Sequence, residues 1–201
     1  THLTESKRLS GRGGEDPALS DQGRDDAERA ASVLSKVGIS GHYSHLKPVT
    51  AIVSSPILRT RETAEILASA LDLKGAIDDD LAEISFGDWD AHTYDEILQR
   101  WPEEWEAWRG SWTVSPPNGE SLSDFDARVM AAKRRIIEDY AGSTVVVVSH
   151  VMPIRGFVRS AYDAGVSAYW TTQVSPCSIT VLKFWGDEAV EVVSVNDSAH
   201  L

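Results

Sequence analysis

Apolar residues follow two patterns along this sequence. Two short runs rich in β-branched residues, VTAIVSS at 49–55 and TVVVVSH at 144–150, are typical of strands buried within a sheet. Elsewhere apolar residues recur at steps of three and four, which is the period of an amphipathic helix. This period predicts helices at 20–38, 58–73 and 121–142. Strands and helices therefore alternate along most of the chain.

Residues suited to helix ends flank two of these helices. Ser20 and Ser121 stand at the start, where a hydroxyl accepts one of the free backbone N–H groups of the first turn. Gly38 and Gly142 stand at the other end, where glycine readily adopts the left-handed backbone that closes a helix. We therefore expect these two glycines to stop the helices.

The last part of the chain predicts a hairpin. Residues 178–185 and 189–195 are rich in β-branched and aromatic side chains and flank a turn at Gly186–Asp187. The earlier alternation of strands and helices favours a mainly parallel sheet with helices on both faces. The predicted fold class is therefore α/β, a three-layer α/β/α sandwich, with residues 1–201 as one domain. In such a sheet the valines at 145–148 should be buried on both faces.

Polar residues with binding chemistry follow both predicted parallel strands. Ligands of open α/β sheets bind beyond the carboxyl ends of the strands. His150 follows one strand and precedes a helix that we expect to begin around Pro153, whose free N–H groups would favour an anion. Arg59 follows the other strand, and a guanidinium binds phosphate or carboxylate through a planar fork. The sequence thus predicts an anion site where these strands end.

Charge and cysteine content limit the function further. A net charge of −12 argues against general nucleic-acid binding, which needs a basic surface. The only cysteine, Cys177, cannot form an internal disulfide, which favours a cytoplasmic location. No run of about 18 apolar residues is present, so no membrane span is predicted. An anion site in so acidic a protein depends on a few local cations.

Five segments taken together resemble a known family. One of them, LAEISFGDWD at 81–90, places Glu83 in fairly apolar surroundings that would raise its pKa, although a surface glutamate is the alternative. With SGRGGEDPALSDQGRDDA, SSPILRTRETAE, PPNGESLSDFDARV and VVVVSHVMPIR, it resembles the histidine phosphatase superfamily, in the phosphoglycerate mutase-like branch. The resemblance covers nearly the whole chain. Within that branch the sequence is most similar to the acid phosphatase or α-ribazole phosphatase domain of actinobacterial bifunctional proteins that also carry RNase H.

The resemblance implies an activity and three central residues. Arg59 matches the second phosphate-binding arginine, and His150 matches the second histidine, which hydrogen-bonds the transferred phosphoryl group. Glu83 matches the acid and base that protonates the leaving oxygen. The implied enzyme is a phosphomonoesterase that hydrolyses a small phosphorylated metabolite through a phosphohistidine, with no metal and no cofactor.

The resemblance also implies residues around the substrate. Ser10 and Gly11 match a loop that lies over it, while Thr1 and Thr4 match polar neighbours of the phosphate. The family's Arg-His-Gly motif, which holds the nucleophilic histidine, is absent from the sequence. By spacing it belongs immediately before Thr1, so we expect the domain to be truncated there and to lack its first strand. His2 is a poor replacement, because no arginine precedes it and no glycine follows it.

Two other functions stay open. A phosphoglycerate mutase-type phosphotransferase would need further cations to hold a substrate carboxylate, and the sequence shows no clear set. A non-catalytic phosphate-binding or interaction domain that lacks the nucleophile is the second. Nucleic acid would be a partner only if an RNase H domain precedes this one, and a homodimer stays open.

Tryptophans are spaced at steps of four, three and four near the middle of the chain, at Trp101, Trp105, Trp108 and Trp112. This spacing predicts one helical face that packs into the core or forms a lid. If the helix caps the predicted crevice, some of these rings would contact the substrate.

Overall fold

The computed structural model describes residues 1–186 and 189–201. Its helices and strands follow one another along the chain as α1 (His2–Glu5), α2 (Asp21–Leu34), β1 (Val49–Ser54), α3 (Leu58–Leu71), β2 (Gly75–Ile77), η1 (Asp79–Leu81), η2 (Gly87–Trp89), α4 (Tyr94–Arg100), α5 (Pro102–Arg109), α6 (Leu122–Asp139), β3 (Thr144–Val148), α7 (Val151–Ala161), α8 (Ala168–Thr171), β4 (Ile179–Trp185) and β5 (Ala189–Asp197). Within the described ranges, every helix is too short or too polar to cross a lipid bilayer.

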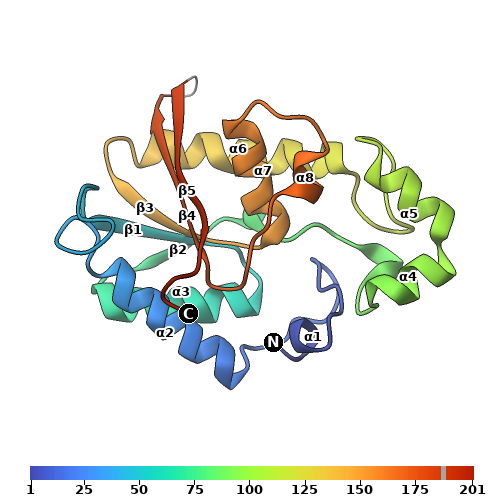
Figure 1. Cartoon of the computed structure of the whole chain (residues 1–201), viewed down its shortest axis with the longest axis horizontal. Coiled ribbons are helices and arrows are strands. Elements are labelled where there is room, and N and C mark those ends of the chain that lie inside the picture. Colours follow the sequence, from blue (N-terminus) through green and yellow to red (C-terminus); the bar gives the residue numbers. More distant parts are fainter. Residues whose placement is uncertain (187–188) are drawn as a thin grey trace.

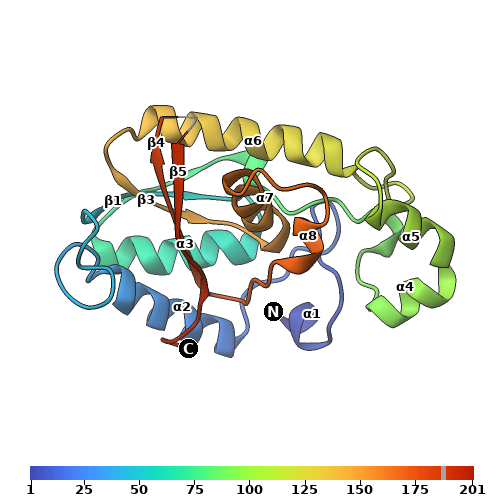
Figure 2. The ribbon, with the colours of Figure 1, turned by 45° about the horizontal axis from the view of Figure 1, so that its top comes forward.

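A parallel sheet with strand order β2-β1-β3 lies between two layers of helices. Helices α2 and α3 cover one face and α6 and α7 cover the other, as Figures 1 and 2 show. Side chains of β1 alternate between these faces: Ile52 packs with the α2–α3 layer, and Val53 packs with Ala132 of α6. The predicted α/β class and the mainly parallel sheet are confirmed.

The valines of β3 are less buried than the sequence predicts. Val148 is 9% exposed, but Val145, Val146 and Val147 are only half-buried. The reason is the place of β3 in the sheet: among the described strands it pairs with β1 alone, so it forms an edge. The prediction of burial on both faces was therefore wrong for three of the four valines.

The predicted helix starts are confirmed, while both helices end earlier than expected. The hydroxyl of Ser20 accepts the N–H of Gly23, and that of Ser121 accepts the N–H of Asp124. Helix α2 ends at Leu34 and not at Gly38, and α6 ends at Asp139 and not at Gly142. Gly38 instead serves a turn with φ of +73°, where a Cβ would lie 2.5 Å from the backbone nitrogen of Pro48.

The C-terminal strands β4 and β5 form the predicted antiparallel hairpin. They make a two-stranded sheet separate from β2-β1-β3. The predicted turn reaches Asp187, which lies outside the described residues.

Tryptophans gather in a core beside helices α4 and α5, yet they do not share one helical face. Trp105 and Trp108 are buried on α5, whereas Trp101 separates α4 from α5 and Trp112 follows α5. The prediction of a single helix was wrong because Pro102, which has no backbone N–H, starts a new one. Rings of Trp89, Trp105 and Trp108 lie 5.5–5.6 Å apart in tilted or edge-on pairs. These pairs form an aromatic core at that end of the molecule.

Candidate active site

The carboxyl ends of β1 and β3 meet at a buried serine–histidine contact. Ser54 pairs with Val148, and the N–H of Ser55 donates to the Val148 carbonyl at 2.9 Å. The Ser55 hydroxyl then lies 2.7 Å from Nε2 of His150. Strand pairing thus fixes the imidazole at the point where ligands of parallel sheets bind.

His150 is 6% exposed and forms the N-cap residue of α7. Burial lowers the pKa of His150 well below its usual value, and the positive charges of Arg59 and Arg128 lower it further. The folded protein therefore keeps this imidazole neutral near pH 7. An anion bound beside it would favour the protonated form.

Arg59, in the first turn of α3, faces the predicted loop. Its guanidinium donates to the Ser10 hydroxyl at 3.1 Å and to the Ser10 carbonyl at 2.8 Å. The next residue, Gly11, donates its N–H to Asp90 at 2.6 Å. A Cβ on Gly11 would lie 2.4 Å from the Ile84 carbonyl, so the loop approaches the Glu83 segment too closely for a side chain. The structure thus brings Arg59, Ser10 and Gly11 together, while the place of this loop over a substrate stays a prediction.

Glu83 lies in the irregular segment between η1 and η2 and is 5% exposed. Its carboxylate accepts the N–H of Ile84 at 2.9 Å and, from the first turn of α7, the N–H of Met152 at 3.4 Å. Burial raises the pKa of Glu83, while these two N–H groups and the charge of Arg59 act against the rise. A carboxyl with a raised pKa can hold and release a proton near neutral pH.

Arg128 of α6 fixes the segment that carries Glu83, and it was missed as a site residue although it lies within PPNGESLSDFDARV. Its guanidinium donates to both carboxylate oxygens of Glu120, at 2.7 and 2.9 Å. It also donates to the carbonyls of Asp80, Ala82 and Glu83 at 2.7, 2.8 and 3.1 Å. This arginine therefore holds the backbone beside Glu83 in place.

Ser55 was also missed as a site residue. The signal was available, because Ser55 lies within SSPILRTRETAE and directly follows a strand. Its role became visible only through the pairing of β1 with β3, which brings together residues 95 positions apart.

Thr1 and Thr4 form hydrogen bonds with each other, away from the cluster of Arg59, Glu83 and His150. The Thr1 hydroxyl caps the short helix α1 and lies 2.9 Å from the Thr4 hydroxyl. Among the described residues, no hydrogen bond joins either threonine to Arg59, Glu83 or His150. Their assignment to the phosphate site stays a prediction.

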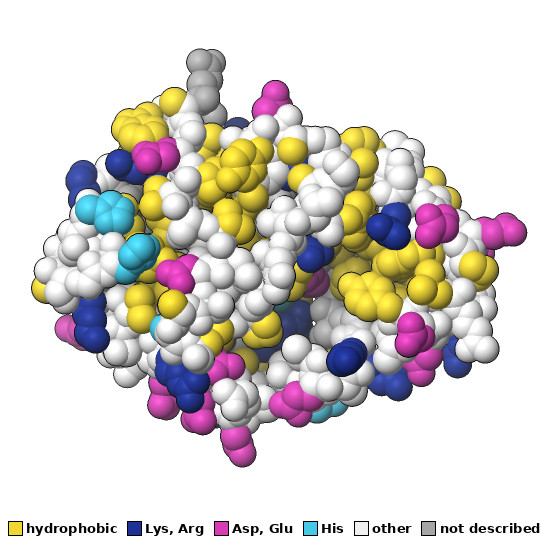
Figure 3. Space-filling model, viewed as in Figure 1, with side chains coloured by type: hydrophobic (Ala, Val, Ile, Leu, Met, Phe, Trp, Pro, Cys, Tyr) yellow, Lys and Arg dark blue, Asp and Glu magenta, His cyan; other side chains and the backbone are white. Residues whose placement is uncertain are grey.

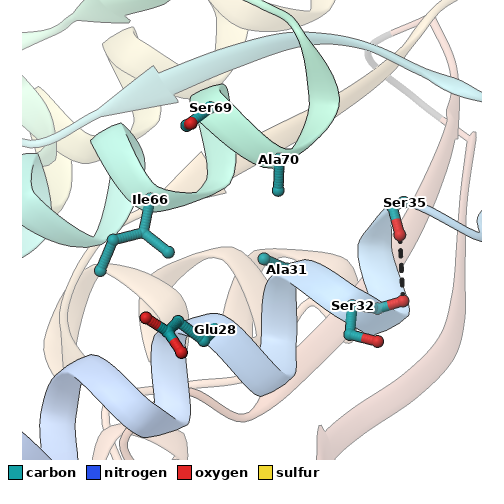
Figure 4. Close-up of a pocket in the computed structure, with 7 residues that line it drawn as sticks. All are labelled: Glu28, Ala31, Ser32, Ser35, Ile66, Ser69 and Ala70. Carbon is teal, nitrogen blue, oxygen red and sulfur yellow. Dashed lines mark hydrogen bonds between the residues drawn. The ribbon is translucent and has the colours of Figure 1, made fainter.

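Two further features do not belong to the cluster. A groove between α2 and α3 is lined by small and apolar side chains with Glu28 as its one charge, and no predicted site residue lines it (Figure 4). Within residues 1–186 and 189–201, no group of three or more His, Cys, Asp and Glu side chains could hold a metal ion.

Comparison with known proteins gives a consistent picture. The family described as the histidine phosphatase superfamily (branch 1) matches residues 1–198. The bifunctional protein Rv2228c of Mycobacterium tuberculosis is 38% identical over 201 residues, which is 100% of this chain and 52% of that protein. The chain thus spans about half the length of this relative.

A second relative and one solved structure are phosphatases by name. Phosphoserine phosphatase 1 of Hydrogenobacter thermophilus is 29% identical over 92% of this chain and 83% of its own. The mycobacterial glucosyl-3-phosphoglycerate phosphatase Rv2419c in complex with VO3 has a TM-score of 0.83 and 27% identity, and it covers 98% of this chain and 95% of its own.

Proposed function

Because the chain belongs to the histidine phosphatase superfamily, we propose that it hydrolyses a small phosphate ester through a phosphohistidine intermediate. One observation carries the proposal: a guanidinium, a neutral imidazole and a buried carboxyl converge where β1 and β3 end. Arg59 supplies the charge for phosphate, His150 a neutral donor or acceptor, and Glu83 a proton. That phosphatases are among the chain's relatives supports the same activity.

The proposed first step moves the phosphoryl group from the substrate oxygen to a histidine nitrogen. The nitrogen lone pair forms a bond to phosphorus while the bond from phosphorus to the alcohol oxygen breaks. Glu83, protonated beforehand, gives its proton to the departing oxygen. Arg59 and His150 hold the equatorial oxygens of the phosphoryl group during transfer.

The second step releases phosphate. A water molecule attacks phosphorus, its proton passes to the Glu83 carboxylate, and the bond between phosphorus and nitrogen breaks. The enzyme histidine and a protonated Glu83 are restored, so atoms and charges balance over the cycle. One carboxyl thus acts as an acid in the first step and as a base in the second.

We place the nucleophilic histidine outside residues 1–201. Nε2 of His150 is bonded to Ser55, and among the described residues no second histidine contacts Arg59, Glu83 or His150. The edge of β3 offers a place for the strand that would carry it. A strand paired parallel to β3 would end beside His150, because the carboxyl ends of parallel strands meet at one edge.

The proposal can be tested with two substrates that differ in their leaving group. Phenolate is a strong base that needs a proton as it leaves, whereas 4-nitrophenolate leaves without one. In the full gene product, Glu83→Gln should lower kcat/KM for phenyl phosphate about 100-fold or more and for 4-nitrophenyl phosphate far less. Arg59→Ala should lower both about 100-fold.

Arg61→Ala serves as the control, because Arg61 is exposed on the same helix as Arg59. It removes an equal charge and should leave both rates unchanged. Equal losses with the two substrates in Glu83→Gln would remove Glu83 from the role of acid. Phosphate binding without any turnover would favour the non-catalytic alternative.

A further inference from the structure

Asp90 is a half-buried acidic residue that the proposed mechanism does not use. It directly follows Trp89 at the end of η2. Burial raises the pKa of Asp90, while the N–H of Gly11 and the positive charge of Arg59 act against the rise. The carboxylate thus lies within electrostatic reach of the arginine that we assign to phosphate. By its charge alone, Asp90 would weaken the binding of an anion there.

The contacts of Asp90 indicate a different role. Residues 10–14 form a loop of sequence SGRGG, called here the SGRGG loop. One carboxylate oxygen of Asp90 accepts the N–H of Gly11 at 2.6 Å. A Cβ on Gly14 would overlap the other carboxylate oxygen, so the backbone at Gly14 lies directly against it. A side chain 79 positions from Gly11 in the sequence therefore contacts the loop at two points.

Ser10, the first residue of the SGRGG loop, is held on both sides. Backbone hydrogen bonds of 2.9 Å join Leu9, the residue before it, to the segment 91–92. Asp90 holds the residue after it through the N–H described above. Ser10 in turn accepts two hydrogen bonds from the Arg59 guanidinium, with its hydroxyl at 3.1 Å and its carbonyl at 2.8 Å. The contacts of Asp90 are thus passed through the loop to Arg59.

The SGRGG loop has little rigidity of its own. Three of its residues are glycine, which restricts the backbone least, and its residues 12–14 are exposed. Figure 3 shows a hollow between the region of α1 and helices α4–α5, with cationic side chains at its edge and within it. The loop follows α1 in the chain. Its position on this side of the molecule therefore depends on contacts with other segments, such as those with Asp90.

We propose that Asp90 is a positioning residue for phosphate binding, which holds the SGRGG loop where Ser10 orients the guanidinium of Arg59. The loop is then ordered before the ligand arrives, so binding does not bear the entropy cost of ordering it. This effect outweighs the repulsion between the Asp90 carboxylate and a bound phosphate. The inference rests on the proposed function, because it requires that Arg59 binds phosphate.

Calorimetric titration of the full gene product with inorganic phosphate tests the inference. Asp90→Ala should weaken phosphate binding about fivefold or more, because the loop loses its contacts with the carboxylate. Asp90→Asn keeps an oxygen that accepts the N–H of Gly11 but lacks the charge, so its affinity should stay within about threefold of the wild type. Asp88→Ala is the matched control, because Asp88 is exposed within η2 and carries the same charge. It should change the affinity by less than about twofold.

A double-mutant cycle locates the effect at the contact between Asp90 and the loop. Gly14→Ala places a Cβ where the Asp90 carboxylate lies, so by itself it should weaken phosphate binding several-fold. In the Asp90→Ala background it should have almost no further effect, because the overlapping carboxylate is gone. Losses that simply add would contradict the inference. If Asp90→Ala does not fold, Gly14→Ala decides alone, and wild-type affinity in that variant rejects the inference.

The failure of this inference can be distinguished from failure of the proposed function. If Arg59→Ala weakens phosphate binding and Asp90→Ala does not, the phosphate site stands and the positioning role of Asp90 is rejected. Tighter binding in both Asp90→Ala and Asp90→Asn would also reject that role, because the carboxylate would then act by repulsion alone. If Arg59→Ala leaves phosphate binding unchanged, the phosphate site is wrong, and the role of Asp90 that depends on it is wrong as well.

Discussion

The positive charges of Arg59 and Arg128 both act on the pKa of Glu83, but the two guanidiniums differ in how many protein partners they have. Arg128 donates to both oxygens of Glu120 and to three backbone carbonyls, so fixed partners occupy its donors. Among the described residues, Arg59 donates only to Ser10, through the hydroxyl and the carbonyl of that one loop residue. Both charges lower the pKa of Glu83, with Arg59 acting more strongly.

The difference separates a structural arginine from a binding one. A guanidinium whose donors are all met by the protein has little to offer a ligand, and removing it leaves its partners unsatisfied. A guanidinium with spare donors costs stability until an anion arrives. Its removal should affect binding more than folding.

The largest effect is expected from Arg128→Ala. It leaves the Glu120 carboxylate unpaired and three carbonyls without a donor, so the free energy of unfolding should fall by about 3–5 kcal/mol. Urea denaturation measures the change. Arg135→Ala on the same helix is the matched control, because Arg135 is exposed and its ion pairs with Asp78 and Asp80 contribute about 1 kcal/mol or less. Similar losses in both variants would contradict the distinction.

Arg59→Ala should have the opposite profile. Affinity for inorganic phosphate should fall about 100-fold, which corresponds to about 2.7 kcal/mol, because the principal charge at the site is lost. The free energy of unfolding should change by about 1 kcal/mol or less, since only the contacts with Ser10 disappear. Calorimetric titration and urea denaturation give the two values. A large loss of stability with intact binding would reverse the assignment of Arg59 and Arg128.

A smaller effect is expected in the pH dependence of the free energy of unfolding, and it arises from His150. In the folded protein the lowered pKa keeps this imidazole neutral, whereas in the unfolded chain it takes up a proton below about pH 6.5. The unfolded state then binds more protons, so stability rises with pH between the lowered pKa and about 6.5, by about 1.4 kcal/mol per pH unit at most. Urea denaturation at pH 5.5 and 7.5 should show this slope in the wild type. His150→Gln should lose that part of the slope, and an unchanged slope would place its origin elsewhere.

The fold could be predicted from the sequence wherever a local pattern is enough to determine the structure. Ser20 and Ser121 cap their helices because a hydroxyl and an N–H three residues apart are local partners. The burial of the β3 valines depends instead on which strand lies beside them, and no local pattern contains that information. Trp101 fell outside the predicted helix because Pro102 starts a new one, and Trp112 did so because α5 ends at Arg109.

The residues of the candidate site divide in the same way, into those that a local pattern marks and those that only contacts in the folded chain reveal. Arg59, Glu83 and His150 could be predicted because each follows or interrupts an apolar segment and matches a family motif. Arg128 was not singled out, although it lies within PPNGESLSDFDARV, because the local helical pattern does not show what its guanidinium contacts. Its role arises only in three dimensions, where it meets Glu120 and the backbone carbonyls beside Glu83.

The smallest effect is expected from Ser55→Ala. This variant tests whether the His150 imidazole needs the hydrogen bond with Ser55 to keep its orientation. The hydroxyl of Ser55 contacts Nε2 of His150 at 2.7 Å and accepts the N–H of Ile57 at 3.3 Å. Its loss should lower the free energy of unfolding by about 1 kcal/mol and weaken phosphate binding several-fold, because the ring loses its orientation. Ser54→Ala is the control, since in the described part of the chain that buried hydroxyl donates only to the Ser55 carbonyl. If both variants bind phosphate equally well, Ser55 supports the strand end and does not position His150.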